Sequence, residues 1–293
     1  MGKLNISSHG RLQDWIAVEK GYFTEAGLDF QFNVKLQQNA DQDIDAAAGV
    51  GDVRVGAYEL YQTGGGGKRD MSCACHWAVN QSAVDNAGRM WGRAYSVLPC
   101  AIYVPSDSGI RKPADLAGVP VAVGYHSGSH FTTIQALEAY LEPDAIELSY
   151  MGMPWDRVDA LLGGDVPAAN LWNAPTYMVE QLGCRKVLDC TFMAGFMFAT
   201  GTDPDDVERY FKALERAQMD LDFEPERYKH YYLDEMPTRY HELVDVRAFG
   251  PGERIVFLPY TAEMYDRTQQ WMRERRLFDP AAATPQYEAV VHV

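Results

Sequence analysis

The side chains best suited to hold a small ligand lie in the segment 124–133, where an apolar run ends in glycine and a helical run begins. The segment carries phenol, imidazole and hydroxyl groups: Tyr125, His126, Ser127, Ser129, His130, Thr132 and Thr133. At a strand-to-helix junction, free backbone N–H groups can hold a sulfonate, carboxylate, nitrate or phosphate. Hydroxyls add contacts, and an imidazole adds a donor that titrates near neutral pH. We predict that this segment contacts a ligand; the alternative is that Ser129 only caps the helix and both histidines lie at the surface. The predicted ligand-binding residues are Tyr125, Ser127, Ser129 and His130, and His126 is the predicted acid or base if the protein is an enzyme.

A second candidate, the segment 7–11, follows the first predicted strand. Ser8 and His9 can contact a ligand there, and His9 can also act as an acid or base. Arg11 can bind an anion through two parallel hydrogen bonds. In the alternative, Ser8 caps the first helix and Arg11 lies in solvent. We favour a functional role for His9 over one for Arg11.

Two further loop-to-helix junctions carry aromatic and polar side chains. At the first junction, Tyr58 can stack on a ligand ring or donate its hydroxyl, and Glu59 can act as a base or bind a cation. A carboxylate at a helix start more often compensates the helix dipole. At the second junction, Trp172 and Asn173 can close over a ligand. A buried core tryptophan is the alternative there.

The segment Cys73-Ala74-Cys75-His76 places two thiols and an imidazole within four residues. One extended segment cannot supply four tetrahedral zinc ligands, and no second cluster of this kind accompanies it. On a strand, Cys73 and Cys75 share one face while His76 lies on the other. We therefore predict buried thiols, no metal site, and a His76 that faces the ligand. The five cysteines show no repeating spacing and are predicted to be free thiols.

Alternating strand-like and helix-like runs join these segments, a pattern typical of an α/β fold with helices on both faces of a sheet. The predicted strands are 3–6, 30–34, 54–56, 99–105, 119–123, 146–150, 168–171 and 187–188, with a return near 195–200. One predicted helix ends at Gly21, and Asp203 caps the start of another. Further predicted helices cover about 41–48, 131–141, 156–162, 176–181 and 261–277.

Three segments together carry a family resemblance. They are Trp15–Phe30 with its glycine stops, Asp45–Ala57 with its Gly-Asp turn, and Ile110–His130. They resemble the periplasmic-binding-protein-like family of aliphatic sulfonate, taurine and nitrate binding proteins and thiamine-pyrimidine synthases. The resemblance implies a type 2 periplasmic-binding-protein-like fold with two lobes, each a mainly parallel sheet flanked by helices, and a ligand cleft between them. Lobe 1 would be 1–98 plus 195–293, and lobe 2 would be 99–194.

Two functions known in that family are disfavoured by departures from its patterns. The eukaryotic thiamine-pyrimidine synthases have a dense run of cysteines in the return strand, where this chain has only Cys190, and a histidine where it has Glu59. The related aryl-sulfinate desulfinases use a cysteine in the loop after the first strand, where this chain has Ser7, Ser8 and His9. Pyrimidine synthesis and cysteine-based desulfination are therefore not expected.

The charge balance limits the partners. The chain has 26 basic and 41 acidic residues, for a net charge of −15, which opposes binding to nucleic acid or to an anionic membrane surface. It has no apolar run long enough to span a bilayer. It also shows no secretory signal, so we expect a cytoplasmic protein as the chain stands, and a periplasmic or extracellular one if a leader has been removed.

The leading hypothesis is a small-molecule binding protein of the sulfonate, nitrate or pyrimidine-precursor type. It would close over a small anionic or heteroaromatic ligand by hinge motion, need no cofactor, and work with an ABC permease if exported. The alternative is a cytosolic cofactor-independent lyase on the same scaffold. That enzyme would use His9, His126 or Glu59 in acid–base steps on a small aromatic acid.

Overall fold

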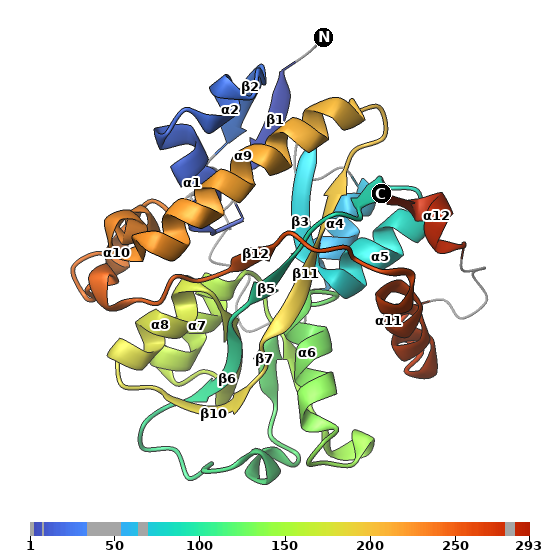
Figure 1. Ribbon diagram of the computed structural model, residues 1–293. Coiled ribbons are helices and arrows are strands. Elements are labelled where there is room, and N and C mark those ends of the chain that lie inside the picture. The colour runs from blue at the N-terminus through green and yellow to red at the C-terminus, as the bar shows by residue number, and fades with distance from the viewer. Residues whose placement is uncertain (1–2, 8, 34–53, 64–69, 279–284) are drawn as a thin grey trace.

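The computed structural model describes residues 3–7, 9–33, 54–63, 70–278 and 285–293 and has an α/β fold with two sheets (Figure 1). The helix predicted near 41–48 and the site residue Ser8 lie outside the described residues. In the described part of the chain, no helix is both long and apolar enough to span a membrane.

The first sheet combines strands from both ends of the chain. Its main path runs β12-β5-β11-β3-β1-β2, with β4 paired to β11 and β13 paired to β4. The strands are β1 (Leu4–Ser7), β2 (Phe30–Asn33), β3 (Met71–Cys75), β4 (Arg89–Trp91), β5 (Tyr95–Leu98), β11 (Phe192–Phe198), β12 (Arg254–Val256) and β13 (Val291–His292). Because β1 runs parallel to β2 and β3, the loop that follows β1 lies at the same edge as the start of the helix that follows β3.

The second sheet is built from the middle of the chain, in the order β10-β6-β9-β7-β8. Its strands are β6 (Cys100–Val104), β7 (Val121–Val123), β8 (Leu148–Tyr150), β9 (Ala168–Trp172) and β10 (Arg185–Asp189). The parallel strands β7, β8 and β9 bring the loops at 124, 151 and 173 to one edge.

Both sheets are mixed rather than mainly parallel. Antiparallel pairs occur where the chain passes between the sheets, at β6 with β9 and β10 in the second sheet and at β11 with β3 and β5 in the first. Residues 192–194 begin β11 and so belong to the first sheet, whereas the lobe boundaries themselves remain a prediction.

Helices cover both sides of each sheet (Figure 1). In the view of Figure 1, α1 and α2 lie to the left of the first sheet, α9 runs diagonally across its upper part, and α4, α5 and α11 lie to its right, while α7 and α8 lie opposite α6 on the second sheet. The bounds are α1 (Leu12–Glu19), α2 (Tyr22–Glu25), α4 (Ala57–Thr63), α5 (His76–Val84), α6 (Gly128–Leu137), α7 (Pro154–Gly163), α8 (Ala174–Gln181), α9 (Pro204–Phe223), α10 (Pro225–Tyr228), α11 (Ala262–Glu274) and α12 (Tyr287–Val290).

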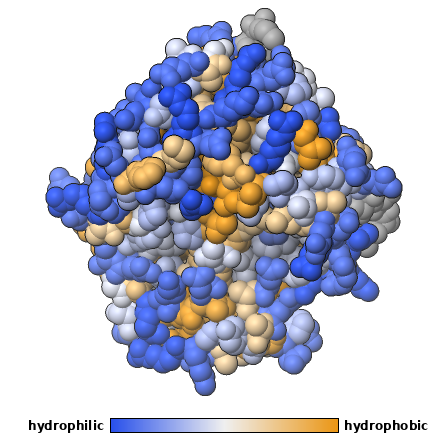
Figure 2. All heavy atoms as spheres, viewed as in Figure 1, coloured by the Kyte–Doolittle hydropathy of each residue, from blue (hydrophilic) through white to orange (hydrophobic). Residues whose placement is uncertain are grey.

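Each of two apolar cores contains side chains from both sheets. One includes Ile16, Phe196 and Leu214 together with Trp155 and Leu171. The other includes Trp77, Phe131, Val121, Phe192 and Tyr265. Hydrophilic residues cover most of the face in Figure 2, with apolar patches near its centre and lower part. The cores therefore hold the two sheets side by side as well as holding helices onto them.

Glycine turns and a helix cap confirm several predicted ends of helices. Gly21 and Gly27 adopt φ of +71° and +76°, the left-handed conformation that glycine reaches without a Cβ clash. The Asp203 side chain accepts a hydrogen bond from the Asp205 N–H, so it caps α9 as predicted. The predicted strands at 30–34, 99–105, 119–123 and 168–171 are present, with ends shifted by one or two residues.

Two local expectations were wrong. Residues 54–56 form no strand, because the Gly56 N–H donates to Glu59 Oε2 and the segment leads into α4 instead of pairing with a neighbour. His76 does not continue the strand of Cys73 and Cys75, because it is the first residue of α5.

Candidate functional site

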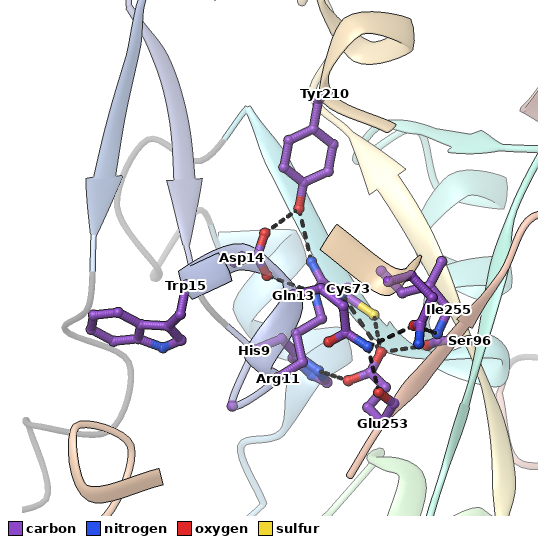
Figure 3. A network of polar contacts seen from close by, with 12 residues as sticks. His9, Arg11, Gln13, Asp14, Trp15, Cys73, Ser96, Tyr210, Glu253 and Ile255 are labelled. Atoms are coloured by element: carbon purple, nitrogen blue, oxygen red, sulfur yellow. Dashed lines mark hydrogen bonds and ion pairs between the residues drawn. The ribbon is translucent and has the colours of Figure 1, made fainter. Parts of the chain in front are cut away.

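His9 and Glu253 form the centre of a polar network at the edge of the first sheet (Figure 3). His9 lies in the loop between β1 and α1, and Glu253 directly precedes β12. His9 Nδ1 lies 3.2 Å from Glu253 Oε2. The two residues are 244 positions apart, so only the return of the chain through β12 brings them together.

The turn before Glu253 needs glycine. Gly252 has φ of +75°, and a Cβ there would meet Asn173 Oδ1 and the Tyr232 hydroxyl. The backbone carbonyl of Glu253 accepts a hydrogen bond from Gln13 Nε2 of α1, at 2.7 Å. Backbone conformation and a helix side chain thus fix the position of this carboxylate.

Arg11 is buried, so the alternative that it lies in solvent is wrong. Its Nε donates to Asp14 Oδ2 at 2.6 Å, and its Nη2 donates to the Tyr210 hydroxyl at 2.8 Å. Its Nη1 lies 3.6 Å from Glu253 Oε1, which is an ion-pair distance without a hydrogen bond. Burial lowers the pKa of Arg11, but the Asp14 and Glu253 charges outweigh it and raise that pKa. Most of this guanidinium is therefore engaged inside the protein.

Glu253 is ionised although its side chain is fully buried. Burial raises the pKa of its carboxyl, but the hydrogen bond from His9 and the charge of Arg11 outweigh burial and lower that pKa to about 2. The Ser96 hydroxyl also donates to Oε1, and Cys73 Sγ lies 3.7 Å from the same oxygen. Burial and the Glu253 charge raise the pKa of the Cys73 thiol, so the thiol stays protonated.

His9, Cys73 and Glu253 also present donor atoms that lie within 4.8 Å of one another. This geometry alone would suit a metal ion. The charge does not, because the buried Arg11 guanidinium lies against Glu253 and repels a cation. We therefore interpret the three residues as part of a hydrogen-bond network rather than as a metal site.

His9 and Asn173 connect the two sheets. The His9 ring stacks on Trp172 at the end of β9, with ring centroids 5.3 Å apart and planes 13° apart. Asn173 Nδ2 donates to the Gly10 carbonyl, and its backbone N–H donates to the Pro99 carbonyl at 2.9 Å. Asn173 has φ of +56° and ψ of −135°, a conformation that a residue other than glycine adopts only when its surroundings hold it there. Such strain is concentrated at functional sites.

A second polar cluster joins α4 to the loop after β7. Glu59 Oε1 lies 2.5 Å from His126 Nδ1. Burial raises the pKa of Glu59, but hydrogen bonds from His126 and the Gly56 N–H outweigh it and lower that pKa. The Tyr58 ring packs edge-on against His126, and its hydroxyl donates to Asp85 Oδ2 at 2.7 Å. Glu59 is therefore a carboxylate with a hydrogen-bonding partner across the two sheets.

The hydroxyls of the loop 124–130 bond within the loop itself. Ser127 Oγ donates to the Gly124 carbonyl at 2.7 Å, and Ser129 Oγ accepts from the Gly124 N–H at 2.9 Å. The N-cap of α6 is Ser127, without a side-chain cap bond, so the alternative that Ser129 caps the helix is wrong. Ligand contacts by Ser127 and Ser129 remain a prediction.

Both histidines of this loop, His126 and His130, are buried, so the alternative that they lie at the surface is wrong. His130 Nδ1 accepts a hydrogen bond from the His126 N–H, and its Nε2 lies 3.3 Å from the Tyr150 hydroxyl. Burial and the neighbouring His126 lower the pKa of His130 to about 3. His126 has φ of +39°, a second strained position in a predicted site. Tyr125 stacks on His126 and lies beneath the Arg54 guanidinium.

His76 lies in the core rather than free at a site. Its Nδ1 lies 2.8 Å from the Met193 carbonyl, and its ring packs on Trp77 at 3.8 Å between centroids. Burial lowers the pKa of His76 to about 4. Cys73 and Cys75 are buried, and all five cysteines are free thiols, as predicted.

The structure thus groups the predicted site residues in two clusters. His9, Arg11, Trp172 and Asn173 lie together around Glu253, and Tyr58, Glu59, Tyr125, His126 and His130 lie together around the loop after β7. Glu253, Ser96 and Tyr210 belong to the first cluster but were not among the residues predicted from the sequence. The one sequence signal for Glu253 is the Gly250-Pro251-Gly252 turn before it.

No family model and no curated protein matches this sequence. Solved structures match its fold along the whole chain. The alkanesulfonate-binding protein SsuA from Xanthomonas axonopodis pv. citri, bound to MOPS, is 15% identical with a TM-score of 0.70, covering 100% of this chain and 98% of that one. The Candida albicans CA3427 gene product, described as having the generic periplasmic binding protein fold, is 10% identical with a TM-score of 0.68, covering 100% and 96%.

A third match is an enzyme. A variant of the desulfurization enzyme DszB in complex with biphenyl-2-sulfinic acid is 16% identical with a TM-score of 0.60, covering 96% of this chain and 94% of that one. This chain therefore has the periplasmic-binding-protein fold, as the resemblance in its sequence implied. At these identities the comparisons establish the fold and not the ligand.

Proposed function

We propose that this protein binds a small anionic or heteroaromatic molecule where the two sheets meet. The end-to-end fold match to an alkanesulfonate-binding protein carries this proposal. Folds of this class commonly place a ligand between two sheets that move about a hinge. If the protein is exported, an ABC permease is the corresponding partner.

The cross-sheet contacts support the position of this site. His9 stacks on Trp172, Asn173 Nδ2 donates to the Gly10 carbonyl, and Glu59 pairs with His126. Each contact joins a side chain near one sheet to a group near the other. A ligand that enters here would meet aromatic rings, imidazoles and carboxylates, a set that suits a planar molecule with polar edges.

Trp172 gives the sharpest binding test. We expect Trp172→Ala to weaken binding of the tightest ligand by roughly tenfold, because loss of an aromatic stack removes about 1 kcal/mol or more. The measurement is isothermal titration against MOPS, short alkanesulfonates, nitrate and aromatic carboxylates. Phe223→Ala is the matched control, since Phe223 is an exposed aromatic residue, 81% accessible. Equal affinity of the Trp172 and Phe223 variants, or no binding to any of these compounds, would count against the site.

A second candidate function is a cofactor-independent lyase, which the pairing of His9 with an ionised, buried Glu253 favours. In such a reaction the C–S or C–C bond of an aromatic sulfinic or carboxylic acid breaks. Its electron pair stays on the ring carbon, which takes a proton from protonated His9, while SO₂ or CO₂ leaves. Conversion of biphenyl-2-sulfinate or an aromatic carboxylate that stops in His9→Ala would support this function, and the absence of turnover would remove it.

A further inference from the structure

His9 is the partly accessible member of its pair with Glu253. Nδ1 faces Glu253, whose side chain is 0% accessible, whereas the His9 side chain is 19% accessible. Nδ1 and Nε2 lie on different sides of an imidazole ring. The contact with Glu253 therefore uses Nδ1 and not Nε2. In the described part of the chain, no hydrogen bond to Nε2 is found.

The surroundings of Glu253 keep its carboxylate ionised and in place. Arg11 lies 3.6 Å from Oε1, and the Ser96 hydroxyl donates to the same oxygen. Oε2 remains for His9. An ionised carboxylate only accepts hydrogen bonds, so the proton between the two residues belongs on Nδ1. A neutral imidazole with its proton on Nδ1 has a lone pair on Nε2.

The hydrogen bonds that join α1 to α9 do not include His9. Arg11, Asp14 and Tyr210 already form a closed set of hydrogen bonds between α1 and α9 (Figure 3). Gln13 holds the Glu253 backbone through its own amide. The His9 ring is added to this set from the accessible side, where it stacks on Trp172 of the other sheet. A purely structural network would not require an imidazole at this position.

We propose that Glu253 is a positioning residue that holds His9 with its Nδ1 proton on the carboxylate and its Nε2 lone pair presented at the junction of the sheets. His9 is then the proton acceptor for a bound molecule that carries an acidic N–H or O–H group. In that step the proton moves from the ligand to Nε2, and the resulting imidazolium is stabilised by Glu253. The claim that His9 accepts a proton from a ligand rests on the proposed binding function. The position of the proton on the His9 ring does not.

Diethyl pyrocarbonate tests the state of His9 without knowledge of the ligand. The Nε2 lone pair attacks a carbonyl carbon of the reagent, an N–C bond forms, and an anhydride C–O bond breaks. The leaving ethyl carbonate takes the displaced proton and decomposes to CO₂ and ethanol. Peptide mass mapping of the full chain follows each histidine separately. We expect His9 to react faster than His76, whose ring is buried and bonded to the Met193 carbonyl.

The Glu253→Gln variant tests the positioning role. It removes the negative charge that holds the proton on Nδ1 but keeps the side-chain size. We expect His9 of this variant to react more slowly with diethyl pyrocarbonate than His9 of the wild type at the same mildly alkaline pH, because an amide opposite Nδ1 no longer keeps the lone pair on Nε2. Glu25→Gln is the matched control, because Glu25 is exposed and pairs with Arg216 on the surface. A modification rate of His9 that falls equally in both variants, or in neither, would overturn the proposal.

Two further measurements keep the outcomes distinct. Long-range ¹H–¹⁵N spectra of the wild type should show the His9 proton on Nδ1, and a proton on Nε2 would overturn the proposal even if Glu253→Gln fails to fold. Protection of His9 from diethyl pyrocarbonate by MOPS or an aromatic carboxylate would support the claim of proton transfer from a ligand. A reactive His9 that Glu253→Gln slows, without protection by any of these compounds, would leave the positioning role intact and remove the claim of proton transfer from a ligand.

Discussion

Glu253 is a charged side chain held away from water, so its surroundings determine its charge. Its partners come from three parts of the chain: His9 and Arg11 in the loop between β1 and α1, Cys73 in β3, and Ser96 in β5. Removing one of the partners would leave the others with an uncompensated buried group. The network is therefore a unit, and its response to acid should be visible in stability.

The first prediction concerns acid unfolding. The pKa of Glu253 in the folded protein is about 2, against an ordinary value of 4.5. A lowered carboxyl pKa contributes stability that is fully present above about 4.5 and is lost as pH falls toward 2. We expect Glu253→Gln to unfold at lower urea than the wild type at neutral pH, with the gap narrowing below pH 4.5. Urea titrations at several pH values measure this, and a gap that does not change with pH would contradict it.

The second prediction concerns His130. Its pKa is lowered to about 3, so the folded state stays neutral where the unfolded chain, with the ordinary value of 6.5, takes up a proton. The unfolded state binds more protons between these values, and stability therefore falls as pH drops from 6.5 toward 3.

We expect His130→Gln to make this decline shallower, measured as the slope of unfolding free energy against pH. His230→Gln, at an exposed position, controls for the loss of an imidazole. Equal slopes in the wild type and the His130 variant would contradict the prediction.

At the level of helices and strands, the best-predicted features are those fixed by a few neighbouring residues. Gly21 and Gly27 stop the chain in a left-handed conformation, and Asp203 caps α9 through its own side chain. Such features need no tertiary contact, so the sequence is enough to predict them. The alternation of strands and helices in 99–189 was predictable for the same reason.

The candidate site was predicted only in part, because its partners are remote in sequence. Glu253 lies 244 residues from His9, and only the pairing of β12 with β5 brings it there. Burial of Arg11 depends on Tyr210 of α9, 199 residues away. Residues 54–56 have strand-like side chains, but the Gly56 N–H bonds to Glu59 Oε2 instead. Local propensity cannot anticipate such tertiary choices.

The third prediction belongs to α9. The Asp203 carboxylate accepts the Asp205 N–H at 3.0 Å, satisfying a backbone donor at the helix start. We expect Asp203→Ala to lower the unfolding free energy by about 1 kcal/mol and Asp203→Asn to lower it by much less, because asparagine also caps helices. Thermal unfolding of the three proteins measures this. Equal losses in both variants would indicate a role for charge rather than capping.

At the scale of the whole molecule, the two sheets share their apolar cores and are also joined by polar contacts. Phe196 and Leu171 of different sheets lie in one core, and Trp77 and Phe131 in the other. The Glu59–His126 and His9–Trp172 contacts lie where the sheets face each other. Polar contacts of this kind can exchange partners when a ligand enters, whereas the apolar cores hold the fold together.

Native mass spectrometry of the protein purified from its own host tests the central claim most directly. The account predicts that the folded protein carries a small molecule that leaves on denaturation and is depleted in Trp172→Ala. A protic anionic or heteroaromatic molecule would agree with the site. A folded wild type that matches the mass of the bare chain, or a bound molecule retained equally in the Trp172 variant, would contradict binding at the junction of the sheets.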